Sequence, residues 1–216
     1  MSYRSSSLAR RLTPAAILRA LVWTSALIAV GAAQMAAAPE PDPVPRRWQL
    51  EIIEGPLRVT SIEFEDGPQA FLYMTYTVTN NSGEDLLFAP SFEIATGENE
   101  VIRSGRGVPL AATKTIIESV QNPLVEDQIS IIGQILQGKE NAKDGIVIWP
   151  LTDMNTSELT VYGAGLSGET ATVTPPGSGE KFVLRKTLMI RYRVSGTLES
   201  RGSTPLDVAE RRWIMR

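Results

Sequence analysis

The 216-residue chain contains neither histidine nor cysteine. Without histidine, the chain has no Ser-His-Asp or Cys-His nucleophile and no imidazole to act as an acid or base near neutral pH. Without cysteine, it has no thiolate nucleophile, disulfide, iron–sulfur cluster or zinc finger. A metal site would have to use oxygen ligands, which favour calcium or magnesium. Carboxylates, lysines and hydroxyls are the groups left for catalysis, and we expect no cofactor.

Charged residues are scarce at the start of the chain, where the only ones before Glu40 are four arginines within residues 1–19. An apolar stretch follows, and the combination is typical of a signal peptide cleaved after Ala33. The uncharged run continues to Ala38, so it also approaches the roughly 20 residues that span a bilayer. We therefore predict either a signal peptide over residues 1–33 or an uncleaved membrane anchor over residues 20–38. Both alternatives place the rest of the chain outside the cytoplasm, in the periplasm or the extracellular space.

The chain without residues 1–33 is acidic. It keeps 17 of the 21 cationic residues against all 24 acidic ones, which gives a net charge of −7. Nucleic acids and anionic membrane surfaces attract basic proteins, so neither is expected as the main partner. Residues 34–45 are rich in proline and are predicted to form a stiff linker. Residues 46–216 are long enough for a single domain with its own core.

From Trp48 onward the dominant hydrophobic period is two, which is typical of β-strands. In residues 72–78 the even-numbered side chains are Leu, Met, Tyr and Val, and the odd-numbered ones are Tyr and Thr. Residues 181–194 alternate similarly, except that Lys186 falls on the apolar face. Turn formers separate the other candidate strands, which cover residues 48–53, 57–64, 86–96, 145–149, 159–164, 170–174 and 212–215. The pattern predicts a mainly β domain, an antiparallel sandwich of about eight to nine strands.

One segment between the early and late strands has a helical period instead. Its apolar residues fall on two short faces, the first made by Ile116, Ile117 and Val120 and the second by Leu124, Ile131, Ile132, Ile135 and Leu136. Pro123 separates the two faces, and Gly138 suits the end of the second helix. We predict two helices over residues 110–138, within an insert that covers residues 110–143. The insert is expected to pack on a sheet face or at one end of the sandwich; a partner-binding or gating role is the alternative.

Two stretches carry a family resemblance. "YTVTNNSGEDLLFAPSFEIATGENEVI" and the later "KENAKDGIVIWPL…SELTVYG" resemble the strand ends, turns and paired strands of exported bacterial immunoglobulin-like domains. The resemblance extends from Trp48 to Gly163, but this chain adds the helical insert and has no lipidation cysteine. It implies an immunoglobulin-like sandwich that serves as a noncatalytic envelope or extracellular module. It transfers no functional residue, because the shared motifs specify the fold rather than a site.

Three short motifs resemble known sites without completing them. "GQILQGKE" (133–140) has the glycine and lysine spacing of a phosphate loop, but it lacks the final Ser or Thr and lies in the predicted helix. "DMNTSE" (153–158) begins like a calcium loop, but Glu158 stands where the turn glycine belongs. "SGEK" (178–181) has the spacing of a Ser–Lys nucleophile pair, but it lies in a predicted turn rather than on a helix. None of the three is a predicted site.

Carboxylates offer one catalytic alternative. Acids cluster at residues 63–66, 84–85 and 126–127, and a pair of them would be the minimum for a hydrolase of the glycosidase type. Adjacent acids in turns are ordinarily solvated surface residues. A carboxylate-dependent hydrolase is therefore kept as an alternative, with no residues assigned to it.

A row of arginines is the best-organised polar feature of the sequence. Arg185, Arg191 and Arg193 fall on one face of the long strand at residues 181–194, in an otherwise acidic protein. They are the candidate docking face for an acidic partner. The alternative is a solvated sheet face, or an edge strand that charge protects from pairing with other strands.

Together these patterns predict an exported, noncatalytic binding or structural module of the cell envelope. Its expected partner is a protein or a polysaccharide of the envelope, and not a nucleic acid. If residues 20–38 are retained, the chain is instead an anchored accessory subunit of an envelope complex.

Overall fold

The computed structural model describes residues 39–97, 100–151, 156–175, 177, 179–198 and 201–216. This part of the chain contains thirteen strands and one helix, α2 (Leu110–Val120). No helix within it is long and apolar enough to cross a membrane. The predicted signal peptide and the predicted anchor both lie outside the described residues.

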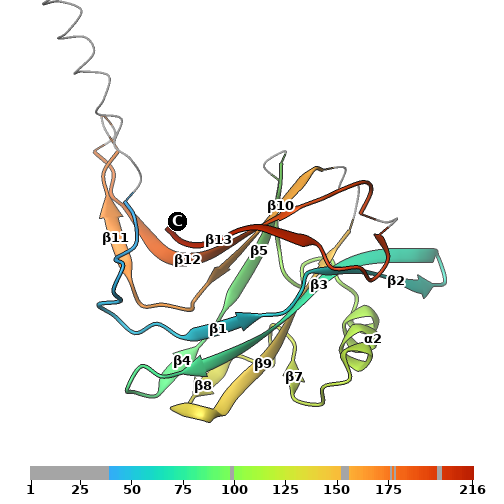
Figure 1. The fold of residues 1–216 in the computed structure, drawn as a ribbon, viewed down its shortest axis with the longest axis horizontal. Coiled ribbons are helices and arrows are strands. Elements are labelled where there is room, and N and C mark those ends of the chain that lie inside the picture. Colours follow the sequence, from blue (N-terminus) through green and yellow to red (C-terminus); the bar gives the residue numbers. More distant parts are fainter. Residues whose placement is uncertain (1–38, 98–99, 152–155, 176, 178, 199–200) are drawn as a thin grey trace, which may run out of the picture. The chain divides into compact units, whose positions relative to one another are not determined.

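Two antiparallel sheets form the body of the domain (Figure 1). The first sheet has the order β1-β3-β9-β7, with β2 also paired to β3. Its strands are β1 (Glu51–Glu54), β2 (Arg58–Phe64), β3 (Gly67–Asn80), β7 (Val125–Glu126) and β9 (Gly138–Pro150). All pairs in this sheet are antiparallel except β7 with β9.

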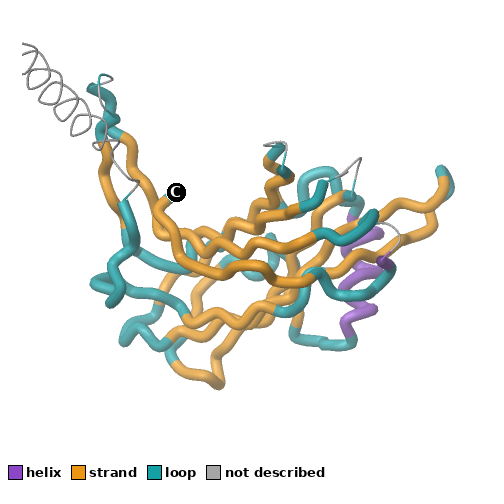
Figure 2. The backbone as a smooth tube through the Cα atoms, turned by 45° about the horizontal axis from the view of Figure 1, so that its top comes forward, coloured by secondary structure: helices purple, strands orange, loops and turns teal. Residues whose placement is uncertain are grey.

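The second sheet has the order β11-β12-β10-β5-β6, with β13 also paired to β12. Its strands are β5 (Ser91–Thr96), β6 (Val101–Arg103), β10 (Glu158–Ala164), β11 (Thr170–Val173), β12 (Phe182–Arg193) and β13 (Asp207–Met215). A separate two-stranded ribbon joins β4 (Leu86–Phe88) to β8 (Gly133–Ile135). The two sheets lie as layers one above the other in both views of the backbone (Figures 1 and 2). The domain is mainly β and its antiparallel sheets form two layers. This architecture is consistent with the predicted sandwich.

The core between the sheets follows the period-two pattern of the sequence. Leu72, Met74 and Val78 of β3 are fully buried, as are Leu188 and the other inward side chains of β12. Both predicted long strands are therefore confirmed, and so is the buried face of β3. The predicted face of β12 is buried from Lys186 to Tyr192, whereas Phe182 at its start is 43% exposed. Removal of these side chains from water is the main favourable contribution to folding.

A second apolar cluster lies on the opposite side of the first sheet. There Phe71 of β3 and Ile146 and Ile148 of β9 pack with Ala112 and Ile116 of α2. This confirms the first predicted helix and its packing on a sheet face. Because α2 covers the sheet, β9 is buried on both faces, which explains why its apolar residues run consecutively rather than alternately.

The second predicted helix is wrong. Residues 124–136 form β7, a turn and β8 instead, and the insert ends inside β9. The Asp127 carboxylate accepts hydrogen bonds from the backbone N–H groups of Ile129 (2.7 Å) and Ser130 (3.1 Å), which stabilises a turn in place of a continuing helix. Of the predicted apolar face, Ile131 and Ile135 are buried, but they enter the core from the turn and from a strand paired to β4. Its other members are exposed: Leu124, Ile132 and Leu136.

The number of strands is also larger than predicted, with thirteen in the described part against eight or nine. One cause is the division of residues 86–96, predicted as a single strand. Leu86–Phe88 pairs with β8, whereas Ser91–Thr96 pairs with β10 in the second sheet. Pro90 lies between them and has no N–H for a sheet hydrogen bond, so the chain changes partners there.

Candidate functional site

Strand β12 places its side chains alternately on the two faces of the second sheet. Because Leu188, Ile190 and Tyr192 point into the core, Arg185, Arg191 and Arg193 lie on the outer face. The neighbouring strands bring more side chains to this outer face, since directly opposed residues of an antiparallel pair share a face. Arg212 lies opposite Met189, and Glu158 lies opposite Arg193.

We call this surface the arginine face. Its six arginines come from β6, β12, β13 and the residue that follows β13: Arg103, Arg185, Arg191, Arg193, Arg212 and Arg216. Its acids are Glu93, Glu158, Asp207 and Glu210. The sequence identified only the three arginines of β12. The other three were missed because strand pairing, and not proximity in the sequence, brings them to the same face.

Arg191 occupies the middle of the arginine face and is neutralised there. Its guanidinium lies 3.4 Å from the Glu158 carboxylate and 3.3 Å from that of Glu210. Glu210 also pairs with Arg212, at 3.0 Å. Arg191 is therefore held between two acids and has little charge to offer a partner.

Arg216 is also engaged within the face. Its guanidinium hydrogen-bonds the Glu93 carboxylate at 2.6 Å and lies over the ring of Tyr162, 4.3 Å from the centroid. Its backbone pairs with that of Arg185, which fixes the side chain across the sheet. Cation–π stacking and the ion pair together hold this arginine flat against the surface.

Three arginines are left without a counter-ion among the described residues: Arg103, Arg185 and Arg193. Each is exposed. All four acids of the face are already paired, Asp207 with Arg201 at 3.9 Å and the others with arginines of the face itself. Arg185 and Arg193 lie eight residues apart on one strand, about 27 Å at the usual rise of a β-strand. The arginine face therefore carries a positive surplus within an acidic chain.

Lys186, the exception to the apolar pattern of β12, is buried on the inner side of the strand. Its ammonium group donates to the Glu169 carboxylate at 2.7 Å and to the Asp42 carbonyl at 3.3 Å, and it lies 5.9 Å from the centroid of the Trp213 ring. Burial by itself would raise the pKa of Glu169. The hydrogen bonds from Lys186 and from the Asp42 N–H, with the positive charge of Lys186, outweigh burial and hold this pKa below its ordinary value.

The same contacts attach part of the predicted linker to the domain. The Asp42 N–H donates to Glu169 Oε1 at 2.7 Å, while the Asp42 carbonyl accepts from Lys186. Residues 39–45 are the described part of the predicted linker 34–45. Through Asp42, this stretch is fastened to the base of β11 and β12 instead of running free of the sandwich.

The short motifs do not assemble into sites. Residues 133–135 and 138–140 of the phosphate-loop-like motif belong to β8 and β9, so the helical setting assigned to it is wrong, and no helix begins there to face a phosphate. Residues 153–155 of the calcium-like motif and Ser178 of the Ser–Lys motif lie outside the described residues. Within the described ranges, no three acids come together as metal ligands.

Two of the acidic clusters serve local structure. Asp85 accepts a hydrogen bond from the N–H of Gln137 at 3.1 Å. Asp127 caps the turn after β7, where partial burial would raise its pKa but hydrogen bonds from Ile129 and Ser130 lower it. A glycosidase acid needs a raised pKa, so the shift at Asp127 has the opposite sign.

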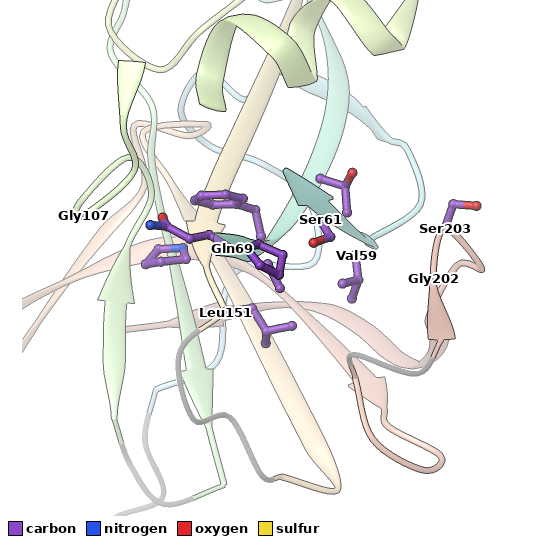
Figure 3. Close-up of a pocket in the computed structure, with 12 residues that line it drawn as sticks. Val59, Ser61, Gln69, Gly107, Leu151, Gly202 and Ser203 are labelled. Carbon is purple, nitrogen blue, oxygen red and sulfur yellow. The ribbon is translucent and has the colours of Figure 1, made fainter. Parts of the chain in front are cut away.

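A cleft of about 840 Å³ opens between β2, β3 and the residues around Ser203 (Figure 3). Val59 and Ser61 line it from β2, Gln69 from β3, and Leu151 from the chain after β9 (Figure 3). None of its described lining residues is ionisable. The cleft has room for a neutral, partly apolar molecule, but it supplies no acid or base.

Comparisons with protein-family models, with curated proteins and with solved structures found no match. The function of the chain is therefore inferred from its own arginine face, cleft and buried lysine.

Proposed function

We propose that the chain is an exported, noncatalytic binding module of the cell envelope, with an immunoglobulin-like sandwich that docks an acidic protein on its arginine face. The chain order of the strands supports the immunoglobulin-like topology. β1 and β3 lie in one sheet, β5 and β6 in the other, β9 in the first again, and β10 and β12 in the second. In an immunoglobulin domain the strands A and B, then C and C′, then E, then F and G alternate between sheets in this way.

A noncatalytic role is supported by what the concave and polar surfaces contain. The cleft has no ionisable group among its described lining residues. The acids of the arginine face are paired with arginines, and Asp127 has a lowered pKa. With no histidine or cysteine in the chain, neither surface offers the perturbed acid–base pair that catalytic sites need.

The observation that carries the docking proposal is the surplus of three exposed arginines on a face whose acids are all paired. Unpaired cations steer an acidic partner toward a surface and fix its orientation. A protein partner is favoured over a polysaccharide because Glu93, Glu158 and Glu210 are spread among the arginines. These acids would repel a uniform polyanion, whereas a protein surface of mixed charge complements both signs.

Charge reversal tests this proposal. The full chain with Arg185→Glu and Arg193→Glu is compared with a control that carries Lys114→Glu and Lys139→Glu, two exposed lysines on α2 and β9. Both variants change the net charge equally. After crosslinking in native envelopes, we expect recovery of the partner protein to fall at least tenfold for the arginine variant and to stay within twofold for the lysine control.

Equal recovery of the partner protein with both variants would show that Arg185 and Arg193 do not form a docking face. If the crosslinked species that the arginine variant loses is one that survives protease digestion, the partner is a polysaccharide and not a protein. Binding through the arginines also predicts weaker recovery at high ionic strength, because salt screens exposed charges.

A further inference from the structure

The cleft beside β2 and β3 begins where the core between the two sheets ends. On the inner face of β2, Val59 is 3% exposed, whereas Ser61, two residues further along the strand, is exposed. Ala70 of β3 lies opposite Ser61 and packs against the core. Leu151, another core residue, is held beside Ala70, because its N–H donates to the Ala70 carbonyl at 2.8 Å. Apolar side chains at the end of the core therefore line the cleft.

Backbone hydrogen bonds hold both sides of the cleft in place. On one side, β2 pairs with β3 along all seven of its residues without a bulge. Ser203 stands on the other side (Figure 3). The segment that carries Ser203 is tied to the start of β2 by the Leu206 N–H, which donates to the Leu57 carbonyl at 2.9 Å. The Arg201 guanidinium also donates to the Pro205 carbonyl at 3.3 Å. The cleft is thus formed before any ligand enters it.

The lining of the cleft is uncharged, although charged residues make up 21% of the sequence. None of the twelve described residues that line the cleft is charged. A second hollow, of about 760 Å³, has Arg46, Arg47, Glu51 and Glu84 among its lining residues. Concave surfaces of this domain are therefore not uncharged as a rule. An ion in the cleft would find no counter-ion among these lining residues, so the cleft favours a neutral ligand.

A few polar groups accompany the apolar lining. The side chains of Ser61, Gln69 and Ser203 are exposed and have no hydrogen-bond partner among the described residues. Hydroxyl and amide groups can each donate and accept a hydrogen bond. Small-molecule sites are typically apolar clefts of about 300–1,000 Å³ with a small number of such groups. The cleft, at about 840 Å³, has both properties.

We propose that this cleft binds an uncharged, mainly apolar small molecule that carries a hydroxyl, carbonyl or amide group. The apolar part of the ligand contacts Val59, Ala70 and Leu151, and its polar group hydrogen-bonds to Ser61 or Ser203. Removal of apolar surface from water favours binding, and the preformed walls reduce the entropy lost on binding. The cleft shares no residue with the arginine face, so this ligand site is additional to the proposed docking of a protein.

A photoreactive ligand tests the proposal in the full chain. The probe is benzophenone, an uncharged apolar ketone that crosslinks to nearby C–H groups under ultraviolet light. Ser203→Trp and Ser61→Trp each place a large ring in the cleft, from opposite sides and at exposed positions. Thr172→Trp is the matched control, because Thr172 is also exposed and lies on β11, at the other end of the domain from β2 (Figure 1). Mass spectrometry of the digested protein locates and quantifies the label.

We expect saturable labelling of the wild-type chain within residues 58–71, at Leu151 or within residues 201–206. Labelling there should fall at least fivefold in each cleft variant and stay within twofold of the wild-type level in Thr172→Trp. The neutral alcohol 1-decanol should compete with the probe. Decanoate should compete at least tenfold less well, because its carboxylate has no counter-ion in the cleft and the domain is acidic.

Labelling that does not saturate, or that lies outside the cleft, would overturn the proposal. Equal labelling of the wild-type chain and both cleft variants would also overturn it, and equal competition by decanoate would overturn the neutral class of ligand. Denaturant unfolding shows whether each variant is folded, and if one cleft variant is not, the other decides. The experiment contains no partner protein, so neither result changes the outcome expected from charge reversal of the arginine face.

Discussion

The outer faces of the two sheets have opposite characters. The outer face of the first sheet carries an apolar cluster at Phe71, Ile146 and Ile148, and the chain covers this cluster with Ala112 and Ile116 of its own helix, α2. The outer face of the second sheet carries six arginines and four acids, and no described helix or strand packs over it (Figure 1). The chain thus covers the apolar cluster on the outer face of the first sheet with its own helix and leaves the outer face of the second sheet charged and exposed.

We expect the covered face to contribute mainly to the stability of the fold and the arginine face mainly to recognition of a partner. Burial of apolar side chains contributes several times more free energy per residue than an exposed ion pair. Changes to the covered face should therefore destabilise the fold, whereas changes to the arginine face should alter binding and leave the fold intact.

The largest effect is expected at the helix-covered face. Ile116→Ala should lower the free energy of unfolding by about 4 kcal/mol, because it removes three carbon atoms from a fully buried position and leaves a cavity. Denaturant unfolding of the full chain measures this loss. Leu110→Ala in the same helix is the control: Leu110 is 69% exposed, and a change of less than about 0.5 kcal/mol is expected. Equal effects at both positions would contradict the role of α2 as a cover.

A somewhat smaller loss is expected from the buried pair on the inner side of β12. Glu169→Gln removes the counter-charge of Lys186 and should cost about 3 kcal/mol at pH 7, since a buried charge is then left uncompensated. Glu158→Gln removes one acid from the half-exposed Arg191 cluster and should cost less than about 1 kcal/mol. If the two variants unfold alike, Lys186 is not buried as described.

The acid dependence of stability sharpens the same comparison. The folded-state pKa of Glu169 lies below its unfolded value of about 4.3, so its contribution is complete above that pH and is lost as the pH falls through the folded pKa. The stability difference between the wild-type chain and Glu169→Gln should therefore shrink as the pH falls below about 4.3 and through the lowered folded-state pKa. A constant difference over this range would show that the Glu169 carboxylate does not titrate with folding.

The smallest effect on stability is expected at the arginine face. Arg185→Glu with Arg193→Glu should change the free energy of unfolding by less than about 0.5 kcal/mol per site, because both side chains are exposed and unpaired among the described residues. The same denaturant titration measures it. A loss as large as that of Ile116→Ala would make the arginines structural and would invalidate the crosslinking comparison as a test of docking.

The pattern of apolar residues in the sequence predicts those strands and helices in which buried side chains recur with the period of the element. The alternation in residues 72–78 gave the core face of β3, and the spacing of Ile116, Ile117 and Val120 gave α2 with its boundary before Pro123. In these elements, sequence periodicity and tertiary packing require the same conformation. Such agreement is what makes a segment predictable.

Residues 124–136 were mispredicted because tertiary contacts override their helical spacing. The Asn80 side chain, fully buried, donates hydrogen bonds to the carbonyls of Ile135 (2.9 Å) and Glu84 (2.8 Å), and these bonds join the turn after β3 to β8. Ile135 lies 55 residues from Asn80 in the sequence. Periodicity within a short window contains no information about it.

The candidate site was predictable only in part, for a related reason. Alternation along β12 placed Arg185, Arg191 and Arg193 on one face. Pairing of Arg191 with Glu210, and of Arg216 with Glu93, depends on which strands are neighbours and in what register. Register is set by the whole sheet, so the sequence did not reveal that Arg191 is neutralised and that Arg103 joins the surplus.

The central claim is that the arginine face contacts a partner protein, and site-specific photo-crosslinking in native envelopes tests it most directly. A photoreactive amino acid is placed at Arg212, an exposed position of the face, and in a second protein at Lys114 on α2. The account predicts a discrete crosslinked protein from position 212 and none from position 114. Crosslinks from position 114 alone, or from neither position, would contradict it.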